Sequence, residues 1–188
     1  MLFLECHKDH NLPLKKTDIH PKTDMTKIIY LDFDGVLHDD AVYWHPKKGI
    51  YLRTPGRQLF EWMHILEDLL SPHPDTKIVL STSWVRAKSY EYAKSQLSPI
   101  LRKKTIGATF HRREMQKIEF DFTSRGLQIW NDVRRRKPIS WIAIDNDEEG
   151  WPAHCRDNLV LTQDRLGLSE TKVQNQIADA LKSMDSSS

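Results

Sequence analysis

Cysteine is scarce in this chain. Of its 188 residues only two are cysteine, Cys6 and Cys155, and they stand far apart without the spacing of metal ligands. This pattern indicates neither a disulfide framework nor a cysteine-based zinc site. We therefore expect two free thiols, as in a reducing compartment such as the cytoplasm.

Long apolar runs and a large excess of one charge are also missing. No run approaches the roughly 20 residues of a membrane helix, and the N-terminus lacks the features of a secretory signal. The net charge of +2 argues neither for nor against nucleic acid as a partner. A basic run at residues 134–137 is interpreted as the solvated end of a helix. The composition predicts a soluble globular protein that does not bind membranes.

The chain reads as one folded unit with polar ends. Residues 1–24 are polar and lack periodicity, so we expect a flexible leader, and whether it belongs to the native protein stays open. Residues 25–184 suit a single domain with a sizeable core. Residues 185–188 are expected to form a disordered, Ser-rich tail.

Short apolar runs alternate with segments of helical spacing. The apolar runs predict strands at residues 27–31, 77–81, 105–110, 140–144 and 158–162. The helical spacing predicts helices at residues 54–70, 86–98, 125–136 and 170–184. This alternation predicts an α/β fold, a doubly wound parallel sheet with helices on both faces.

Two acids follow the first predicted strand. Asp32 and Asp34 are two residues apart, so their side chains point to the same side of an extended chain. Ligands of parallel sheets bind at the carboxyl ends of the strands, which is where these acids stand. An acidic turn containing Gly35 would explain the same residues, and this segment alone leaves both interpretations open.

Polar residues also end two later strands. Thr82 and Ser83 follow the second strong strand, where they would suit either a phosphate site or a helix cap. Asp145 and Asp147 follow the strand at 140–144. A parallel sheet would bring these ends together, and the clustered carboxylates would need a cation. Mg²⁺, a hard ion that prefers oxygen ligands, is the simplest choice.

Taken together, these segments resemble the signatures of the haloacid dehalogenase (HAD) superfamily. Residues 28–37 are similar to its first signature, an apolar strand followed by Asp-x-Asp-Gly. Residues 78–83 resemble the second signature, and residues 142–147 resemble the acidic fourth. The third signature is a lone basic residue near a helix start, for which Arg125 fits best and Lys117 is the alternative.

Two details refine this resemblance. The Leu-Ser-Thr-Ser-Trp sequence ending at Trp84 is similar to a small subgroup found in bacterial RNA-repair ("Swiss Army Knife") proteins. Asn146 stands where the superfamily often has a second acid, so the respective roles of Asn146 and Asp147 stay open. The gaps after Leu37 and after Trp84 are too short for a full cap domain, so the resemblance implies a capless form with an open site.

The resemblance implies a Mg²⁺-dependent phosphatase that works through an aspartyl-phosphate. Asp32 would be the nucleophile and Asp34 the general acid and base. The implied phosphate-binding residues are Thr82, Ser83 and Arg125. The implied metal-binding residues are Asp32, Asp34, Asp145 and Asp147. The partner would be a phosphorylated substrate, either a small molecule or a nucleic-acid end, and no stable protein partner is implied.

Three other functions are less consistent with the sequence. A non-catalytic binding or scaffold domain would be expected to lack a core acid, yet Asp32, Asp34 and Asp145 are all present. The missing cap disfavours a phosphomutase. A response-regulator receiver is disfavoured because the phosphorylated Asp of that class follows a later strand than the first acidic pair does.

Three features next to the signatures are less specific. Residues 38–53 contain aromatic and lysine side chains, which suit a substrate flap, although a packed hairpin is slightly favoured. Trp84 is interpreted as a core residue. His38 could touch the substrate, although an exposed loop residue is the favoured interpretation.

Overall fold

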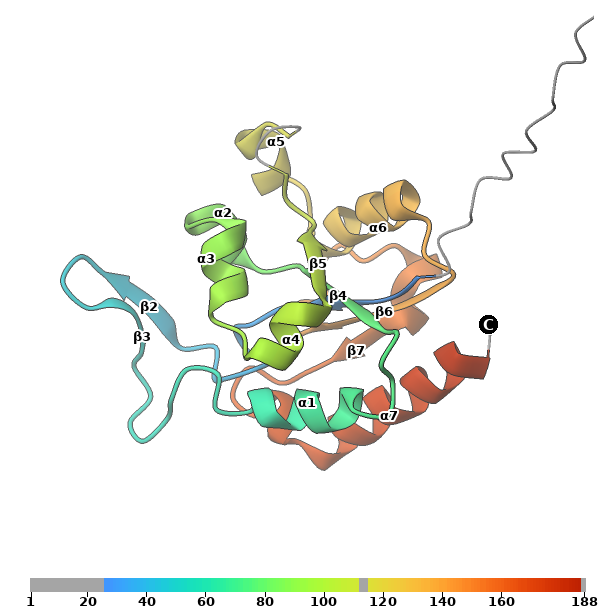
Figure 1. The fold of residues 1–188 in the computed structure, drawn as a ribbon. Helices are drawn as coiled ribbons and strands as arrows, with labels where there is room; N and C mark the ends of the chain where they lie inside the picture. Colours follow the sequence, from blue (N-terminus) through green and yellow to red (C-terminus); the bar gives the residue numbers. More distant parts are fainter. Residues whose placement is uncertain (1–25, 112–114, 187–188) are drawn as a thin grey trace, which may run out of the picture.

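A five-stranded parallel sheet forms the centre of the protein (Figure 1). The computed structural model describes residues 26–111 and 115–186, so the expected leader at residues 1–24 lies outside the described residues. The strands are β1 (Lys27–Leu31), β4 (Lys77–Leu80), β5 (Thr105–Ala108), β6 (Ser140–Asp145) and β7 (Leu159–Leu161). Their order is β5-β4-β1-β6-β7, and every neighbouring pair is parallel. The predicted doubly wound α/β fold is confirmed.

The strand order reverses next to β1. The chain moves outward from β1 through β4 to β5, and then returns to β6 on the other side of β1. In open parallel sheets the ligand site lies at such a reversal, outside the carboxyl ends of the strands. The ends of β1 and β6 are therefore the place where this fold favours a site.

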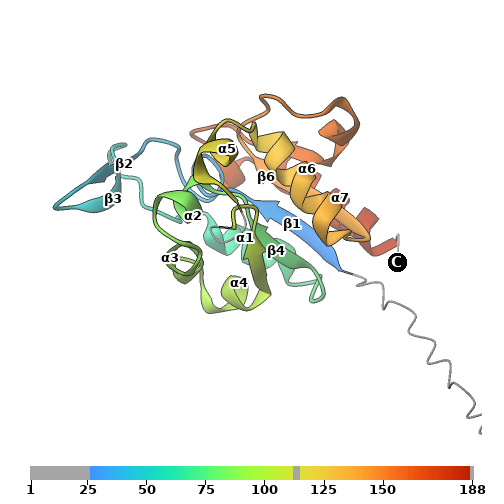
Figure 2. The same cartoon turned by 90° about the horizontal axis from the view of Figure 1, so that it is seen from above.

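Helices cover both faces of the sheet (Figures 1 and 2). α1 (Met63–Leu70) and α7 (Thr171–Ser186) cover one face, where Ile29 and Leu31 of β1 join the larger apolar core. α6 (Arg125–Arg136) covers the other face, where Ile28 and Tyr30 join the smaller core. Successive β1 side chains thus enter different cores, which explains why the whole strand is apolar.

A buried polar cluster attaches α6 to the sheet. Asp132 is 1% exposed, and its carboxylate accepts hydrogen bonds from the Tyr30 hydroxyl at 3.0 Å and from Arg136 Nε at 2.6 Å. Arg135 also pairs with this carboxylate. Arg134 and Arg135 are exposed at the end of α6, as expected for a solvated helix end, but that interpretation is wrong for Arg136, whose side chain is largely covered.

The helix predicted from residue 54 begins at Met63 instead. The backbone enters the left-handed region at Gly56 and Phe60, with φ of 79° and 61°, which interrupts any helix before that point. The Trp62 N–H then donates to the Leu37 carbonyl at 3.0 Å, which ties the start of α1 to the loop after β1.

The helix predicted over residues 86–98 is also wrong as a single element. The segment forms α2 (Ser83–Ala87) and α3 (Tyr90–Ser95), and α4 (Pro99–Lys104) follows. Ser89 has an extended backbone and caps α3 with its hydroxyl, which separates α3 from α2. Pro99 lies in the first turn of α4, where a missing N–H costs no hydrogen bond.

The last helix runs beyond its predicted end. α7 continues to Ser186, because Asp185 accepts a hydrogen bond from Lys27 Nζ at 2.8 Å and lies 2.6 Å from His73 Nδ1. Residues 187 and 188 of the expected tail lie outside the described residues. Within residues 26–111 and 115–186, no helix is long and apolar enough to cross a membrane.

A two-stranded hairpin projects from the body between β1 and α1 (Figures 1 and 2). Its strands are β2 (Val42–His45) and β3 (Gly49–Leu52), which pair antiparallel. Val42 and Ile50 pack against the core, but Tyr43 and Trp44 remain 45% and 58% exposed. The segment expected as either a flap or a packed hairpin is thus attached at its base and open beyond it.

The remaining described elements are short. α5 (Lys117–Asp121) lies near the start of α6, and the 3₁₀ helices η1 (Ala153–Asn158) and η2 (Gly167–Ser169) flank β7.

Candidate active site

Two buried acids lie side by side where the strand order reverses. Leu31 of β1 pairs with Ile144 of β6, so Asp32 and Asp145 follow on neighbouring strands. The Asp32 N–H donates to the Ile144 carbonyl at 3.1 Å, which extends the ladder by one residue. Asp32 is 4% exposed and Asp145 is completely buried. The predicted meeting of the two strand ends is observed.

Arg125 is the cation that these acids share. It is the first residue of α6, and its Nη1 lies 3.4 Å from Asp32 Oδ2 and 3.5 Å from Asp145 Oδ2. Lys117, the alternative, lies on α5 and lines a different pocket. The structure thus brings Arg125 to the acids, which supports it as the residue of the third signature.

Burial is the main influence on the ionisation of this cluster. It raises the pKa of Asp32, an effect that Arg125 opposes and Asp34 increases. Burial also raises the pKa of Asp145 well above its ordinary value; Asp32 adds to this shift and Arg125 opposes it. For Arg125, burial alone would lower the pKa, but the nearby carboxylates raise it above its ordinary value. One guanidinium therefore compensates only part of two buried negative charges.

Asp34 is held by a different group of side chains. Its Oδ1 accepts a hydrogen bond from the Trp84 indole N–H at 2.8 Å and lies 3.1 Å from His38 Nε2. The Ser83 hydroxyl lies 3.5 Å from Asp34 Oδ2. These contacts fix the direction of the Asp34 carboxyl at the edge of the sheet.

Neither of the two closer contacts of Asp34 was predicted from the sequence. His38 is completely buried, so the interpretation as an exposed loop residue is wrong. Trp84 is 3% exposed, as expected for a core residue, but its indole N–H also donates a hydrogen bond to Asp34. The spacing of four residues between Asp34 and His38 was a local signal for their contact, whereas no local signal linked Trp84 to Asp34.

Thr82 and Ser83 begin α2 beside the acids. The Thr82 hydroxyl caps the helix by accepting from the Trp84 N–H at 3.4 Å. Burial raises the pKa of Asp32, and a hydrogen bond from the same Thr82 hydroxyl acts against that rise. Thr82 therefore caps α2 and also lies in the candidate site. The two interpretations of this segment, a helix cap and a phosphate site, are compatible.

The loop after β6 orients Asp145 and packs on the loop after β1. Asp147 is exposed, its N–H donates to Asp145 Oδ1 at 3.0 Å, and its own Oδ1 accepts from the Glu149 N–H at 2.8 Å. Asn146 lies against Gly35, where a Cβ would approach Asn146 Nδ2 to 2.6 Å. Gly35 also has a φ of 69°, so both its backbone angle and its surroundings favour glycine.

Helix α6 approaches this loop just as closely. A Cβ on Gly126 would lie 2.6 Å from the Trp151 Cα. The Trp151 indole N–H donates to the Asp147 carbonyl at 2.8 Å. The first turn of α6, which carries Arg125, is therefore in direct contact with the loop that carries Asp147.

Asp32 and Asp145 are the residues best suited to hold a metal ion. Asp145 Oδ2 is buried and has no hydrogen-bond partner within the described part of the chain. Such an oxygen fits a hard cation. Among the described residues, no three His, Cys, Asp or Glu side chains form a group that would hold a metal ion. Carboxylate oxygens are the donors that Mg²⁺ prefers, so these two acids are the residues that could hold such an ion.

A pocket of about 330 Å³ opens beside the acids. The expected phosphate-binding residues Thr82, Ser83 and Arg125 all line it, together with Arg86 and Asp147. Residues taken from three separate sequence segments thus converge on one cavity that is large enough for a phosphate group.

The fold and the order of the acids along it define a HAD-like α/β domain. A family model for the HAD domain in Swiss Army Knife RNA repair proteins matches residues 28–173. Because this match covers most of the sequence, the chain belongs to that family. Searches of the curated proteins and of the solved structures found no match.

Proposed function

We propose that this domain is a phosphomonoester hydrolase that acts through an aspartyl-phosphate on Asp32. The observation that carries the proposal is the cluster in which Asp32 and Asp145 share Arg125 beside a pocket lined by Thr82 and Ser83. Membership of a HAD family supports hydrolase chemistry, and the RNA-repair context of that family supports a nucleotide or nucleic-acid end as substrate.

In this proposal Asp32 and Asp34 divide the chemistry between them. The Asp32 carboxylate attacks phosphorus, the bond to the leaving oxygen breaks, and Asp34 gives that oxygen a proton. Asp34 then removes a proton from water, which attacks the same phosphorus and releases phosphate from Asp32. Trp84 and His38 hold the Asp34 carboxyl in place for both transfers.

Attack of a carboxylate on a phosphate joins two anions. Two like charges about 4 Å apart repel by roughly 4 kcal/mol at an effective dielectric constant near 20. Arg125 would offset this repulsion from one side and the Thr82 hydroxyl would donate to a phosphoryl oxygen. Asp32 and Asp145 would hold Mg²⁺, with the Asp34 backbone carbonyl as a further ligand. The bound ion would supply positive charge to the phosphoryl group.

The test is a phosphate-release assay on wild type and Asp32→Asn, with Mg²⁺ and with EDTA. The panel contains p-nitrophenyl phosphate, sugar phosphates, nucleotides, phosphopeptides and oligonucleotides phosphorylated at the 3′ or 5′ end. We expect Mg²⁺-dependent turnover that falls about a thousandfold in Asp32→Asn, a loss of about 4 kcal/mol of transition-state stabilisation. The matched control is Asp179→Asn, on an α7 side chain that is 79% exposed.

Two results would count against the proposal. Turnover that survives in Asp32→Asn would exclude this residue as the nucleophile. A folded wild-type protein that hydrolyses none of the panel would instead favour a non-catalytic binding domain with the HAD fold.

A further inference from the structure

The β2–β3 hairpin presents two aromatic rings that remain about half exposed. Tyr43 is 45% exposed and Trp44 is 58% exposed. Each ring has a cation above it. The Arg53 guanidinium carbon lies 4.7 Å from the centre of the Tyr43 ring, and Lys88 Nζ lies 5.1 Å from that of Trp44. Aromatic rings of the hairpin are thus interleaved with one cation from the hairpin segment and one from the end of α2.

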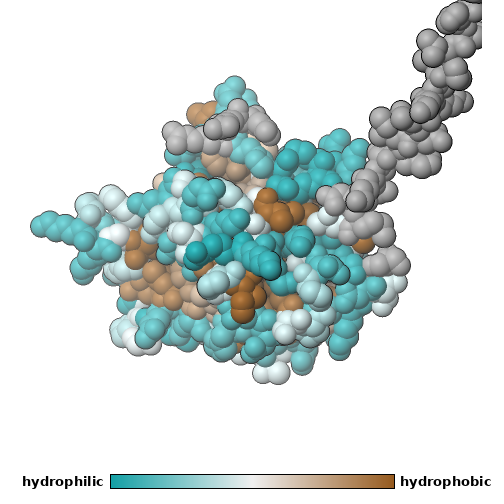
Figure 3. All heavy atoms as spheres, in the orientation of Figure 1, coloured by the Kyte–Doolittle hydropathy of each residue, from teal (hydrophilic) through white to brown (hydrophobic). Residues whose placement is uncertain are grey.

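Positive charge is concentrated on the same segment. Residues 40–53 contain three basic residues and one acidic residue, which gives the hairpin segment as much net positive charge as the whole chain. Hydrophilic residues cover the projecting hairpin in Figure 3. Surfaces that bind other folded proteins through aromatic side chains are usually depleted of lysine, so this composition favours an anionic partner with flat rings.

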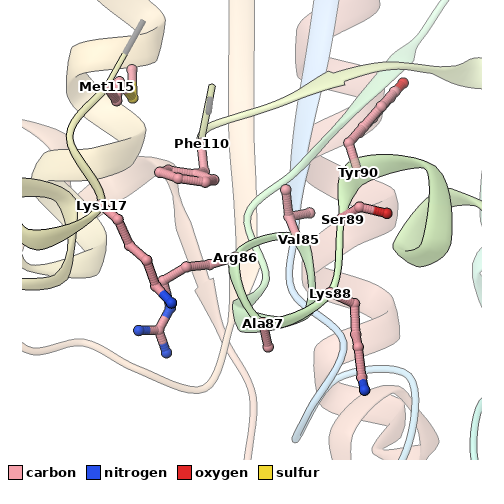
Figure 4. A pocket seen from close by; sticks show the side chains of 9 residues that line it. All are labelled: Val85, Arg86, Ala87, Lys88, Ser89, Tyr90, Phe110, Met115 and Lys117. Atoms are coloured by element: carbon pink, nitrogen blue, oxygen red, sulfur yellow. The ribbon is translucent and has the colours of Figure 1, made fainter. Parts of the chain in front are cut away.

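A line of cations connects the hairpin to the candidate active site. Lys88 follows α2, the helix that begins beside Asp34, and it reaches Trp44. Arg86 and Lys88 line a pocket of about 430 Å³ together with Lys117, and the three side chains point to the same side in Figure 4. Arg86 also lines the pocket of about 330 Å³ that contains Arg125. The two pockets therefore share a basic residue.

Arg86 is able to change its partner. It pairs with Asp121 of α5 at 2.8 Å, and both side chains are about one-third exposed. Exposed ion pairs of this kind contribute little to stability, so a phosphate group can replace the carboxylate at small cost.

We propose that the hairpin and α2 bind a single-stranded polynucleotide that leads into the active site. Bases stack on Tyr43 and Trp44, and backbone phosphates follow Lys88 and Arg86 towards Arg125. Stacking platforms combined with a basic groove are how proteins hold single strands without reading their sequence. Duplex bases have both faces covered, so a duplex binds more weakly. The inference rests on the proposed function for the reaction at the end of the strand, whereas binding is measurable without turnover.

The binding experiment uses fluorescence anisotropy with labelled single strands of roughly 12 nucleotides, within the range that such grooves contact. RNA and DNA versions of one sequence are compared, both without a terminal phosphate. The double variant Tyr43→Ala/Trp44→Ala is expected to lose roughly tenfold or more in affinity. The matched control, Tyr43→Phe/Trp44→Phe, keeps the flat rings and is expected to bind nearly as tightly as wild type.

Charge is tested with a second pair of variants. Lys88→Glu is expected to weaken binding and to reduce its dependence on salt concentration. Lys172→Glu, on an exposed residue of α7, makes the same charge change away from the hairpin and is expected to have a small effect. Binding that is equal in the Ala double variant and in wild type would overturn the proposal, as would equal losses in the two Lys variants.

Turnover separates failure of this inference from failure of the proposed function. The Ala double variant is expected to raise KM for a phosphorylated strand and to leave kcat/KM for p-nitrophenyl phosphate unchanged. If the protein binds strands through Trp44 but hydrolyses no ester, the binding surface stands and the phosphatase proposal fails. If it hydrolyses small esters but binds neither RNA nor DNA strands, the surface is wrong and the phosphatase proposal stands.

Discussion

Two buried carboxylate–arginine clusters lie along helix α6, and they differ in how well their charges are matched. At Asp132 one carboxylate meets two guanidinium groups and a tyrosine hydroxyl. At the edge of the sheet Asp32 and Asp145 both approach Arg125, and Asp145 Oδ2 has no hydrogen-bond partner among the described residues. A buried acid is therefore found both in the Asp132 cluster and in the candidate active site. The candidate active site differs because its two acids share a single arginine.

The largest expected difference between the clusters concerns stability. Asp132→Asn is expected to lower the free energy of unfolding by about 3 kcal/mol, because two arginines lose their buried partner. Asp32→Asn is expected to leave it unchanged or to raise it in EDTA, since burial raises the pKa of Asp32 and so disfavours its charged form. Urea unfolding at pH 7 measures both values. Equal losses would show that the two clusters are equivalent.

Metal ions are expected to act on only one cluster. Mg²⁺ at about 100 times its Kd should raise the free energy of unfolding of wild type by about 2.7 kcal/mol. Asp145→Asn should remove this increase because it removes the unsatisfied carboxylate oxygen. Thermal unfolding with Mg²⁺ and with EDTA measures the effect, and Tyr30→Phe, which changes the other cluster, is the control. A wild-type protein that Mg²⁺ does not stabilise would contradict the assigned metal ligands.

The contribution of the Tyr30 hydroxyl to the free energy of unfolding is expected to depend on pH. Tyr30→Phe removes a hydrogen bond to a buried carboxylate and is expected to cost about 1.5 kcal/mol at neutral pH. Burial, followed by the charge of Asp132, raises the pKa of Tyr30 above its ordinary value. Since the unfolded tyrosine loses its proton near pH 10, the contribution of Tyr30 is complete below about pH 10 and is lost as the pH rises above it.

Unfolding curves of both proteins between neutral and alkaline pH measure this dependence. Wild type should lose more stability above about pH 10 than Tyr30→Phe does. Identical pH dependence would mean that the folded and unfolded states titrate alike at this residue.

The smallest effect is expected at Trp84. Trp84→Phe keeps the aromatic packing but removes the N–H that orients Asp34, so kcat for phosphate release should fall about tenfold with little change in KM. Trp141→Phe is the matched control, because Trp141 packs edge-on against Tyr30 in the other cluster. A kcat that falls equally in both variants would assign Trp84 a packing role alone.

The sheet was predictable because its signal is local. β1, β4 and β6 are continuous apolar runs that end in acids or hydroxyls. The start of α1 was not predictable, because it depends on a left-handed backbone at Phe60 and on a hydrogen bond from Trp62 to Leu37 across the fold. Tertiary contacts of this kind override helical spacing.

In the candidate site, too, local patterns predicted some contacts and tertiary contacts determined the others. The approach of Asp32 to Asp145 followed from placing both after parallel strands. The contact of Trp84 with Asp34 depends on how the loop after β1 folds back, which no local pattern reports. The position of Asp132 on the inner face of α6 was predictable from the sequence. Arg125, Ile129 and Asp132 share one helical face, because they are spaced by four and three residues.

The close approach of Gly126 to Trp151 restricts how related sequences can vary. Any side chain at position 126 would press on the Trp151 backbone and move the turn that carries Arg125. Because the closest atom belongs to the backbone, a different side chain at position 151 would not relieve this contact. We therefore expect glycine at position 126 to be retained among active relatives, whichever residue stands at position 151.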